Sequence, residues 1–271
     1  MRALLASLAI SAGLYFAIVA LAYSFQRDLL YFPSQIVLSE KQLEEADFEA
    51  VKIASKGAAE LLSLWRPPAD PTKPVVIHFH GNAGSLAVRL PIYQAMAQDG
   101  AGVLAVGYPG YGGNPGVPSE ETFYAAAQAH YDWLLVQGYG ADRIVVAAQS
   151  LGTGVAIWLA SRNEASGLIL EAAYTGMDEM AQRQFPILPA KLLIKDRYRS
   201  IERIDQIDMP LIWIHGTNDE LIPFEMGQRL FDAAKEPKIA QPIENGGHND
   251  LWMRGIDAVV RNGAQSFVSG G

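Results

Sequence analysis

Three polar residues far apart in the chain carry the side chains that nucleophilic catalysis needs. Ser150 interrupts the apolar run VVAAQSLGTGVAI, Asp219 ends the motif HGTND, and His248 lies in the motif GGHN. A serine hydroxyl attacks a carbonyl carbon when an imidazole takes its proton and a carboxylate orients that imidazole. We therefore take Ser150, His248 and Asp219 as candidate nucleophile, base and acid. The chemistry they would carry is acyl transfer to water.

The residues around Ser150 favour a sharp turn from a strand into a helix. The apolar segment Ile144 to Ala148 precedes Gln149-Ser150, and small apolar residues follow directly. Two polar side chains inside a core segment would each need hydrogen-bond partners. A nucleophile elbow of the pattern G-x-S-x-G meets this need because it lifts the serine out of the sheet. Ala148 stands in place of the first glycine, and its methyl is small enough for the elbow to form.

Two backbone N–H groups are candidates for an oxyanion hole, the pair of donors that stabilises a developing negative oxygen. One is the N–H of Leu151, directly after the serine and at the start of a helix. The other is predicted in the motif HGNAG after an apolar strand, where we assign it to Asn82, with Ala83 as the alternative. The predicted supporting residues are His80, Gly81, Ala83, Gly84 and Gln149.

Each of these residues also has a plainer interpretation. A serine at a strand-to-helix turn is usually a helix N-cap, and Glu220 and Asp178 compete with Asp219 for the role of the acid. We favour Asp219 because the order Ser…Asp…His, with each residue directly after a strand, is the order of α/β-hydrolases.

The remaining polar core residues are expected to be structural. His78 and His80 share one face of a strand, as zinc ligands would, but no third ligand lies nearby, so no metal site is predicted. We expect His130 and His215 to be packing or surface residues. Glu171 is expected to be a buried, hydrogen-bonded support beneath the site.

The rest of the chain alternates short apolar strands with helices, which predicts an α/β fold. Its features are a mostly parallel sheet covered by helices on both faces and a site at the carboxyl ends of the strands. The first two strands, around a turn at Gly57, are expected to form an antiparallel edge pair. The predicted strands are 48–55, 61–66, 75–79, 103–108, 144–148, 168–172, 211–215 and 239–243. The predicted helices are 85–98, a helix capped at Ser119 that reaches about Val136, 151–161, 225–234 and 251–267.

The first 27 residues are set apart from this pattern. Ala3 to Phe25 contains no charged residue, and about 20 apolar residues suffice for a helix to cross a bilayer. A signal peptide cleaved after Ala22 is the alternative, but its apolar core is usually shorter. We therefore predict a single-pass anchor in residues 1–27. Positive charge before the helix, with Arg27 and Asp28 nearly balanced after it, favours a domain outside the cytoplasm.

Residues 28–271 are predicted to form one domain, with a small lid-like insertion around residues 181–206 that crosses the strand ends. The chain has 271 residues and a net charge of −8, which argues against a nucleic-acid partner. It contains no cysteine, which excludes disulfides, thiolate metal sites and a cysteine nucleophile.

Motifs along almost the whole chain resemble those of one family. They are LYFPS (30–34), HGNAG (80–84), YPGYG (108–112), PSE (118–120), QSLG (149–152), HGTND (215–219) and GGHN (246–249). Together they are similar to the Bem46-like group of α/β-hydrolases, which includes the ABHD13- and ABHD17-like serine hydrolases. Pro109 and Asn114 depart from the group, which often has arginine and serine at these positions.

The resemblance implies hydrolysis of carboxylic esters or thioesters through an acyl-enzyme, without a metal or organic cofactor. The expected substrate is a small-molecule or lipid acyl compound, and the expected membrane contact is the N-terminal helix. Two alternatives stay open: a serine peptidase that acts on short peptides, and a non-catalytic, membrane-tethered interaction protein. The sequence determines neither the acyl chain nor the oligomeric state.

Overall fold

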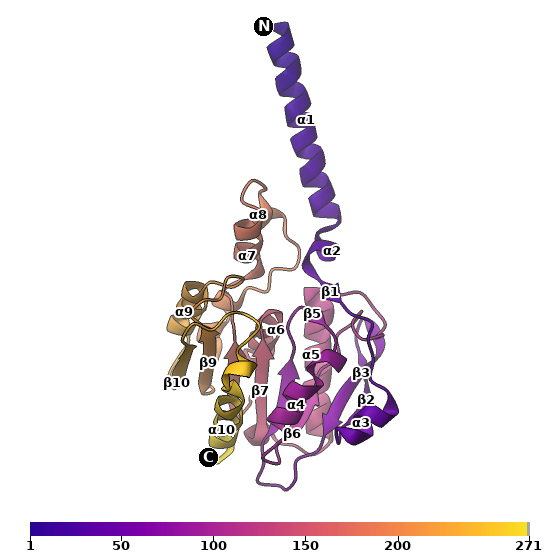
Figure 1. Ribbon diagram of the computed structural model, residues 1–271, viewed down its shortest axis with the longest axis vertical. Helices are drawn as coiled ribbons and strands as arrows, with labels where there is room; N and C mark the ends of the chain where they lie inside the picture. The colour runs from indigo at the N-terminus through magenta and orange to yellow at the C-terminus, as the bar shows by residue number, and fades with distance from the viewer. Residues whose placement is uncertain (270–271) are drawn as a thin grey trace.

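An eight-stranded sheet lies at the centre of the computed structural model, which describes residues 1–269 (Figure 1). Its strand order is β10-β9-β8-β7-β4-β6-β3-β2. β3 pairs antiparallel with both β2 and β6, and all the other neighbours are parallel, as the sequence predicts. The strands are β2 (Glu49–Ser55), β3 (Ala58–Arg66), β4 (Val75–Phe79), β6 (Gly102–Ala105), β7 (Ile144–Gln149), β8 (Gly167–Glu171), β9 (Leu211–Gly216) and β10 (Lys238–Ile243).

Helices cover both faces of the sheet, and each face has its own apolar core. One core includes residues of α5, α6 and α9, and the other includes residues of α3, α4 and α10. All residues of the central strands β4 and β8 are buried, as expected for parallel strands covered on both faces. The helices are α1 (Arg2–Ser24), α2 (Gln26–Leu30), α3 (Glu40–Glu45), α4 (Leu90–Met96), α5 (Glu120–Val136), α6 (Leu151–Ala160), α7 (Met177–Gln184), α8 (Ala190–Leu193), α9 (Phe224–Ala233) and α10 (Ile256–Ser269).

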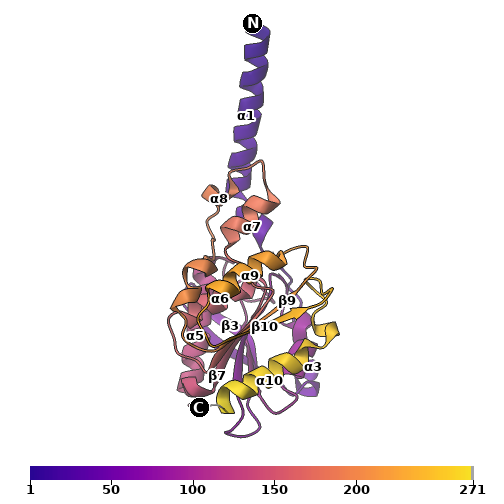
Figure 2. The same cartoon turned by 90° about the vertical axis from the view of Figure 1, so that its left-hand side faces the viewer.

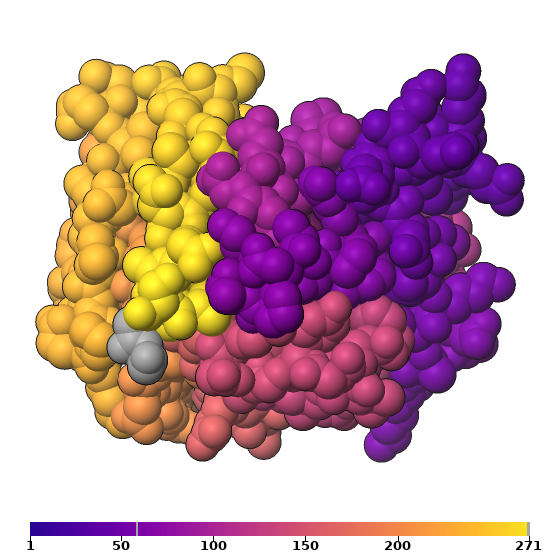
Figure 3. All heavy atoms as spheres, turned by 90° about the horizontal axis from the view of Figure 1, so that it is seen from below, coloured from indigo at the N-terminus to yellow at the C-terminus, as the bar shows by residue number. Residues whose placement is uncertain are grey.

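The C-terminal helix α10 closes one side of the molecule. Seen from the end opposite α1, this yellow helix lies against purple segments from the first half of the chain (Figure 3). Arg261 on α10 makes ion pairs with Asp99, just after α4, and with Asp257 one turn earlier on its own helix. These contacts hold the last helix against the face of the sheet that α4 covers.

Three predicted elements differ from the structure. The expected strand 103–108 ends at Ala105, because Gly107 donates its N–H to the Ser63 hydroxyl instead of continuing the ladder. The expected helix 85–98 is α-helical only over α4, which has a proline at its first turn. The expected helix 251–267 is interrupted at Gly255, whose φ of 83° is left-handed, so α10 begins at Ile256.

The switch point of the sheet lies between β4 and β7. From β4 the chain proceeds to β6 on one side, and it then returns to β7 on the other side of β4. Ligands in open α/β sheets bind outside the carboxyl ends of the strands at such a point. The loop after β4 carries the motif HGNAG and the turn after β7 carries Ser150, so the fold brings these two motifs together.

α1 projects from the same end of the sheet that α7 and α8 cover (Figures 1 and 2). Within residues 1–269 it is the one helix long and apolar enough to cross a membrane, and none of its residues is buried. α7 and α8 belong to the excursion between β8 and β9, where the sequence places the lid-like insertion. A two-residue strand β1 (Phe32–Pro33) follows α2 and pairs with β5 (Ala83–Gly84), which lies in the HGNAG motif.

Candidate active site

Ser150 occupies a strained turn between β7 and α6. Its φ of 50° and ψ of −121° are rare for a residue with a side chain and cost about 1–3 kcal/mol. Its side chain makes no capping hydrogen bond to α6. Its hydroxyl oxygen lies 3.0 Å from Nε2 of His248 instead. This geometry disfavours the N-cap interpretation of the serine and has the form of a nucleophile elbow.

The elbow depends on the small residues beside the serine. A Cβ atom at Gly152 would lie 2.1 Å from the carbonyl oxygen of Phe79, at the end of β4. Glycine is therefore required at this position for α6 to approach the sheet. Ala148 occupies a buried position in β7, in register with Phe79 and Leu170 on its two neighbours. Its methyl group is accommodated there, as the sequence predicts.

His248 reaches the serine from the loop after β10. Its Nδ1 lies 2.8 Å from Oδ2 of Asp219, so the imidazole bridges the hydroxyl and the carboxylate. Gly216, at the end of β9, lies close to Gly246 and Gly247, the glycine pair before His248. A Cβ added at Gly216 would lie 2.3 Å from the carbonyl oxygen of Gly246. Asp250 accepts a 2.7 Å hydrogen bond from the N–H of Gly247 and fixes the same loop.

Asp219 is buried and well supplied with donors. Its Oδ1 accepts the N–H groups of Leu221 at 2.9 Å and Ile222 at 2.8 Å. Burial is the largest single effect and raises the pKa of this carboxyl group. The hydrogen bonds from His215, His248 and Ile222 together outweigh it and hold the pKa well below the usual 3.8. Asp219 is therefore a carboxylate at neutral pH.

Neither alternative acid contacts the imidazole. Glu220 lines the adjoining cavity, and Asp178 on α7 lies 4.0 Å from the guanidinium of Arg199. Among the acidic residues weighed from the sequence, Asp219 is the one that hydrogen-bonds to His248.

His215 has a more specific position than the sequence analysis predicted. It is fully buried in β9, and its Nε2 lies 2.9 Å from the carbonyl oxygen of Ile222, so this nitrogen is the donor. The same nitrogen lies 3.4 Å from Oδ2 of Asp219. His215 therefore holds the loop that carries the carboxylate. Its place in HGTND, four residues before the aspartate, is the one sequence signal that could have indicated this support.

The HGNAG loop passes directly beside the serine. A Cβ at Gly81 would lie 3.4 Å from the Cβ of Ser150. His80 is buried, and its Nδ1 lies 2.7 Å from the carbonyl oxygen of Gly81. The hydroxyl of Tyr108 donates to the backbone carbonyl oxygen of His80. Asn82 and Leu151 line the same cavity as Ser150. The roles of Asn82 and Leu151 as oxyanion donors stay predictions.

The Asn82 side chain links this loop to the segment that follows α1. Its Nδ2 donates to the carbonyl oxygen of Leu30 at 2.5 Å. Its Oδ1 accepts the Phe32 N–H at 3.3 Å and the Tyr111 hydroxyl at 3.0 Å. The position of the HGNAG loop is thus coupled to α2 and β1, the segment that follows α1.

Glu171 lies beneath the serine, where the sequence analysis expected a buried support. Its carboxylate accepts hydrogen bonds from Gln149 Nε2 at 2.8 Å and from the Trp252 indole at 2.9 Å. Burial raises the pKa of Glu171 to about 7, although the donors from Trp252 and Gln149 oppose the shift. Its own carbonyl oxygen accepts the N–H of Ser150. Glu171 thus supports the elbow through both its backbone and its side chain.

The two histidines near β4 are neutral core residues. His78 packs edge-on against Tyr93, and burial lowers its pKa to about 3. Burial also lowers the pKa of His80 well below its ordinary value. In the described part of the chain, no three His, Asp or Glu side chains are grouped so that they could hold a metal ion.

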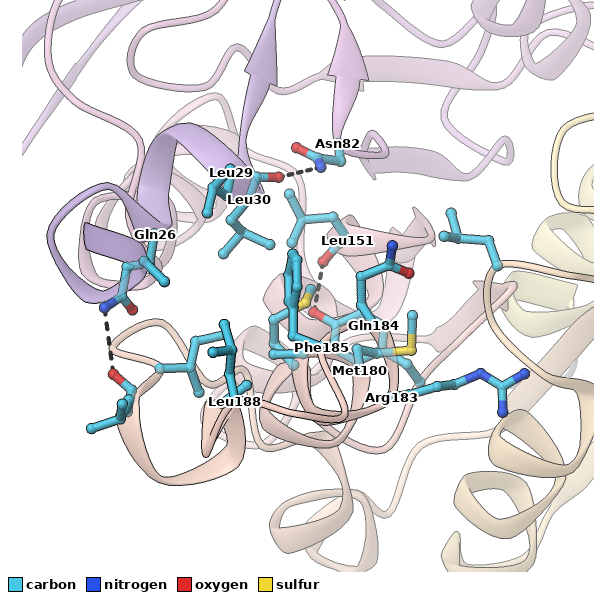
Figure 4. Close-up of a pocket in the computed structure, with 18 of the residues that line it drawn as sticks. Gln26, Leu29, Leu30, Asn82, Leu151, Met180, Arg183, Gln184, Phe185 and Leu188 are labelled. Atoms are coloured by element: carbon cyan, nitrogen blue, oxygen red, sulfur yellow. Dashed lines mark hydrogen bonds between the residues drawn. The ribbon is translucent and has the colours of Figure 1, made fainter. Parts of the chain in front are cut away.

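A cavity of about 550 Å³ extends from Ser150 toward the N-terminal helix (Figure 4). Leu29 and Leu30 lie on one side of it, and Met180, Phe185 and Leu188 lie on the other (Figure 4). Most of its other lining side chains are also apolar. The cavity therefore suits an apolar group attached to the carbonyl that Ser150 would attack.

Comparisons with known proteins agree with this geometry. A family model described as the alpha/beta hydrolase fold matches residues 74–192. The Xenopus laevis alpha/beta hydrolase domain-containing protein 17B is 31% identical over 201 residues, which cover 73% of this chain and 68% of that protein. The chain belongs to the α/β-hydrolase family. The resemblance drawn from the sequence motifs and the predicted fold are thus confirmed.

Two further matches lie across most of this α/β-hydrolase. The Mycobacterium tuberculosis protein Rv2307c is 35% identical over 261 residues, which cover 93% of this chain and 92% of that protein. The solved structure of the Pyrococcus furiosus esterase Pf2001 superposes with a TM-score of 0.68 at 18% identity, over 88% of this chain and 97% of that one. At that identity the likeness concerns the fold alone.

Proposed function

We propose that this α/β-hydrolase is a membrane-anchored serine hydrolase that cleaves carboxylic ester or thioester bonds of acyl substrates. The observation that carries the proposal is the 3.0 Å distance from the Ser150 hydroxyl to an imidazole that also contacts the Asp219 carboxylate. This arrangement can deprotonate the hydroxyl during attack. Ser150 also has a strained backbone conformation, and such strain is found most often at functional sites.

The proposed reaction has two steps. His248 takes the proton of the Ser150 hydroxyl while the serine oxygen bonds to the acyl carbon. The tetrahedral intermediate then loses the alcohol or thiol, which receives that proton from His248. Water next gives a proton to His248 and attacks the acyl-enzyme, and Ser150 leaves with the proton restored. Asp219 holds the imidazole in the required tautomer, and the N–H groups of Leu151 and Asn82 stabilise the oxyanion.

The cavity supports an acyl substrate over a short peptide. Its apolar lining offers little to compensate the desolvation of a peptide backbone, whereas an acyl chain gains free energy there. The esterase Pf2001 has the same fold, so the fold itself is known to serve ester hydrolysis.

The N-terminal helix is proposed to be a retained anchor. Val19, Ala22 and Tyr23 line the cavity of the site, and the Tyr15 hydroxyl donates to the carbonyl oxygen of Ile187. Cleavage after Ala22 would remove part of this wall. We propose that the domain lies on the non-cytoplasmic side, because Arg2 precedes the helix while Arg27 and Asp28 nearly balance after it.

The proposal is tested with a fluorophosphonate probe and a series of p-nitrophenyl esters. The folded protein should be labelled at Ser150 and should turn over the esters. Ser150→Ala should abolish both, whereas Ser161→Ala, a change at the other end of α6, should abolish neither. A protein that is neither labelled nor active would contradict the proposal and favour a non-catalytic interaction protein. Turnover of a peptide panel without ester turnover would favour the peptidase.

A further inference from the structure

The link between α7 and α8 is an apolar tip bounded by basic residues. This tip, residues 184–190, reads QFPILPA and contains no charged residue, while Arg183 precedes it and Lys191 follows it. Ile187 in the tip is 82% exposed, and Leu192 just beyond it is 75% exposed. Exposed apolar side chains between basic residues are typical of a segment that enters a lipid interface, because the long cationic side chains can reach the headgroups.

The carbonyl groups of the tip are supplied with donors from within the protein. Nε2 of Gln182 lies within hydrogen-bond distance of the carbonyl oxygens of Phe185, Pro186 and Leu188, at 3.0–3.4 Å. The remaining carbonyl of this run, that of Ile187, accepts the Tyr15 hydroxyl of α1 at 3.0 Å. An irregular segment enters hydrocarbon only if its backbone groups are paired, since lipid offers no hydrogen bonds. The two N–H bonds of Gln182 are shared among three of these carbonyls, and the Tyr15 hydroxyl serves the fourth, so all four lie near a donor of the protein.

The contact with Tyr15 sets the depth of the tip. Tyr15 lies nine residues before the end of α1 at Ser24, which is about 14 Å along a helix axis. The hydrocarbon core of a bilayer is about 30 Å thick, so with Ser24 near the interface a tip at that height reaches deep into one leaflet, close to the bilayer midplane. Lys195 lies 4.3 Å from the centre of the Tyr23 ring, and this cation–aromatic pair is typical of the interface itself.

One face of α1 forms a wall of the cavity that begins at Ser150. Val19, Ala22 and Tyr23 line it, and their spacing places them on one side of α1. Gln26, the first residue of α2, also lines the cavity. Phe185 and Leu188 of the tip also line the cavity, on the side opposite Leu29 and Leu30 (Figure 4). The cavity therefore runs from the serine to α1 and the tip.

We propose that the tip inserts into the leaflet beside α1 and that the cavity takes one long acyl chain of a membrane lipid ester directly from that leaflet. This inference rests on the proposed function, because it assigns a substrate class to the same serine. A chain already in the leaflet enters without crossing water, and its ester group arrives at Ser150 near the headgroup level.

The size of the cavity suits an acyl chain. About 550 Å³ lies within the range of about 300–1,000 Å³ that ligand cavities in proteins commonly have. The cavity can therefore accommodate one acyl chain of a lipid. We accordingly commit to a single-chain lipid ester, and a palmitoyl monoglyceride is the probe.

The test uses the full chain in vesicles and compares two tryptophan variants on α1. Ala22→Trp places an indole in the cavity wall, whereas Ala20→Trp makes the same change at an exposed position that does not line the cavity. The readout is the ratio of palmitoyl-monoglyceride hydrolysis to p-nitrophenyl acetate hydrolysis. We expect Ala22→Trp to lower this ratio about tenfold, because about two methylene groups lose their place in the cavity. Ala20→Trp should leave the ratio unchanged.

Each outcome of this comparison is informative. An equal ratio in both variants overturns the assignment of the acyl chain to the cavity. Hydrolysis of a palmitoylated peptide on the same vesicles, without hydrolysis of the monoglyceride, replaces the lipid by an acylated protein and overturns the proposal. If the wild-type chain hydrolyses no ester and takes no fluorophosphonate, the proposed function fails and this inference fails with it.

Insertion of the tip has a separate readout that needs no catalysis. The chain contains no cysteine, so Ile187→Cys can carry one environment-sensitive dye. Val136→Cys is the matched control, because Val136 is also 82% exposed but lies at the far end of α5. Spin-labelled lipids should quench the dye at position 187 and leave it bright at position 136. An unquenched dye at position 187 overturns the insertion.

Discussion

Burial and hydrogen bonding shift the pKa values of the two buried carboxyl groups of the site in opposite directions. Asp219 and Glu171 are both buried carboxyl groups, yet the pKa of the first is lowered and that of the second is raised to about 7. The difference follows from their partners: Asp219 has two imidazoles and two backbone N–H groups, whereas Glu171 has one amide and one indole. We therefore expect the two groups to respond differently to substitution and to pH.

Asp219→Asn should reduce ester turnover by about 10³–10⁴-fold, because an amide that donates toward Nδ1 favours the wrong imidazole tautomer. Asp178→Asn is the control, since Asp178 was a candidate acid from the sequence and does not contact His248. The measurement is kcat/KM for p-nitrophenyl butyrate at pH 8. Near-normal turnover in Asp219→Asn, with loss in Asp178→Asn, would contradict the assignment of the acid.

Glu171→Gln should change how stability depends on pH. The pKa of Glu171 is about 7 in the fold and 4.5 in the reference state, so unfolding releases its proton between these values. Wild-type stability is therefore lost as pH rises from about 4.5 to 7, by on the order of 3 kcal/mol. Relative to wild type, the glutamine variant should gain stability across this window.

Thermal unfolding of both proteins between pH 5 and pH 8 measures this difference. Replacing one carboxylate oxygen of Glu171 by an amide NH2 group changes stability by an amount that does not depend on pH. The quantity to compare is therefore the slope of stability against pH. Parallel curves for the two proteins would show that Glu171 does not titrate in this range.

At the scale of elements, the site depends on how closely α6 approaches the end of β4. The strained elbow directs α6 under the HGNAG loop, and Gly152 is the position at which helix and strand come together. β7, β9 and β10 supply Ser150, Asp219 and His248 from their carboxyl ends. Parallel pairing of these strands is what brings three distant motifs to one edge.

Gly152→Ala should destabilise the protein and impair catalysis, because its methyl group would lie 2.1 Å from a backbone oxygen that cannot move freely. The expected loss is about 3 kcal/mol, the upper range for overpacking. Gly13→Ala is the control, since no atom lies within 4 Å of a Cβ at that helical position. Calorimetric unfolding and fluorophosphonate labelling measure the two effects. Unchanged stability and labelling in Gly152→Ala would contradict the close approach.

At the scale of the whole molecule, the site, α7, α8 and the N-terminal helix all lie at one end (Figures 1 and 2). Gln26 links them through hydrogen bonds to the Leu193 carbonyl oxygen and the Lys195 N–H, and Arg27 pairs with Asp196. This arrangement places the end with the candidate active site against the membrane when α1 spans it. The orientation across the bilayer then decides which compartment supplies the water.

Single cysteines introduced into the cysteine-free chain should report that orientation. Lys56→Cys, in the exposed turn between β2 and β3, should react with a membrane-impermeant maleimide on intact cells. Ala3→Cys should react only after permeabilisation. We expect this pattern because Arg2 precedes α1, while Arg27 and Asp28 nearly balance after it. The reverse pattern would place the domain in the cytoplasm.

The sequence by itself determined the fold class, the order of the three polar motifs along the chain and the apolar N-terminal helix. These features depend on local pattern: strand and helix periodicity, motif order and the length of an uncharged run. Ala148 could also be judged from the sequence, because steric size alone decides whether it fits the elbow.

The tertiary structure decided what depends on atoms brought together from distant segments. The sequence left three candidate acids, and only the folded chain places Asp219 against His248. It did not indicate the contact of His215 with the aspartate loop, or the cavity between α1 and the tip at residues 184–190. These contacts span sequence separations from four residues, for His215 and Asp219, to 172 residues, for Tyr15 and Ile187. In each case the side-chain distance follows from packing and not from spacing along the chain.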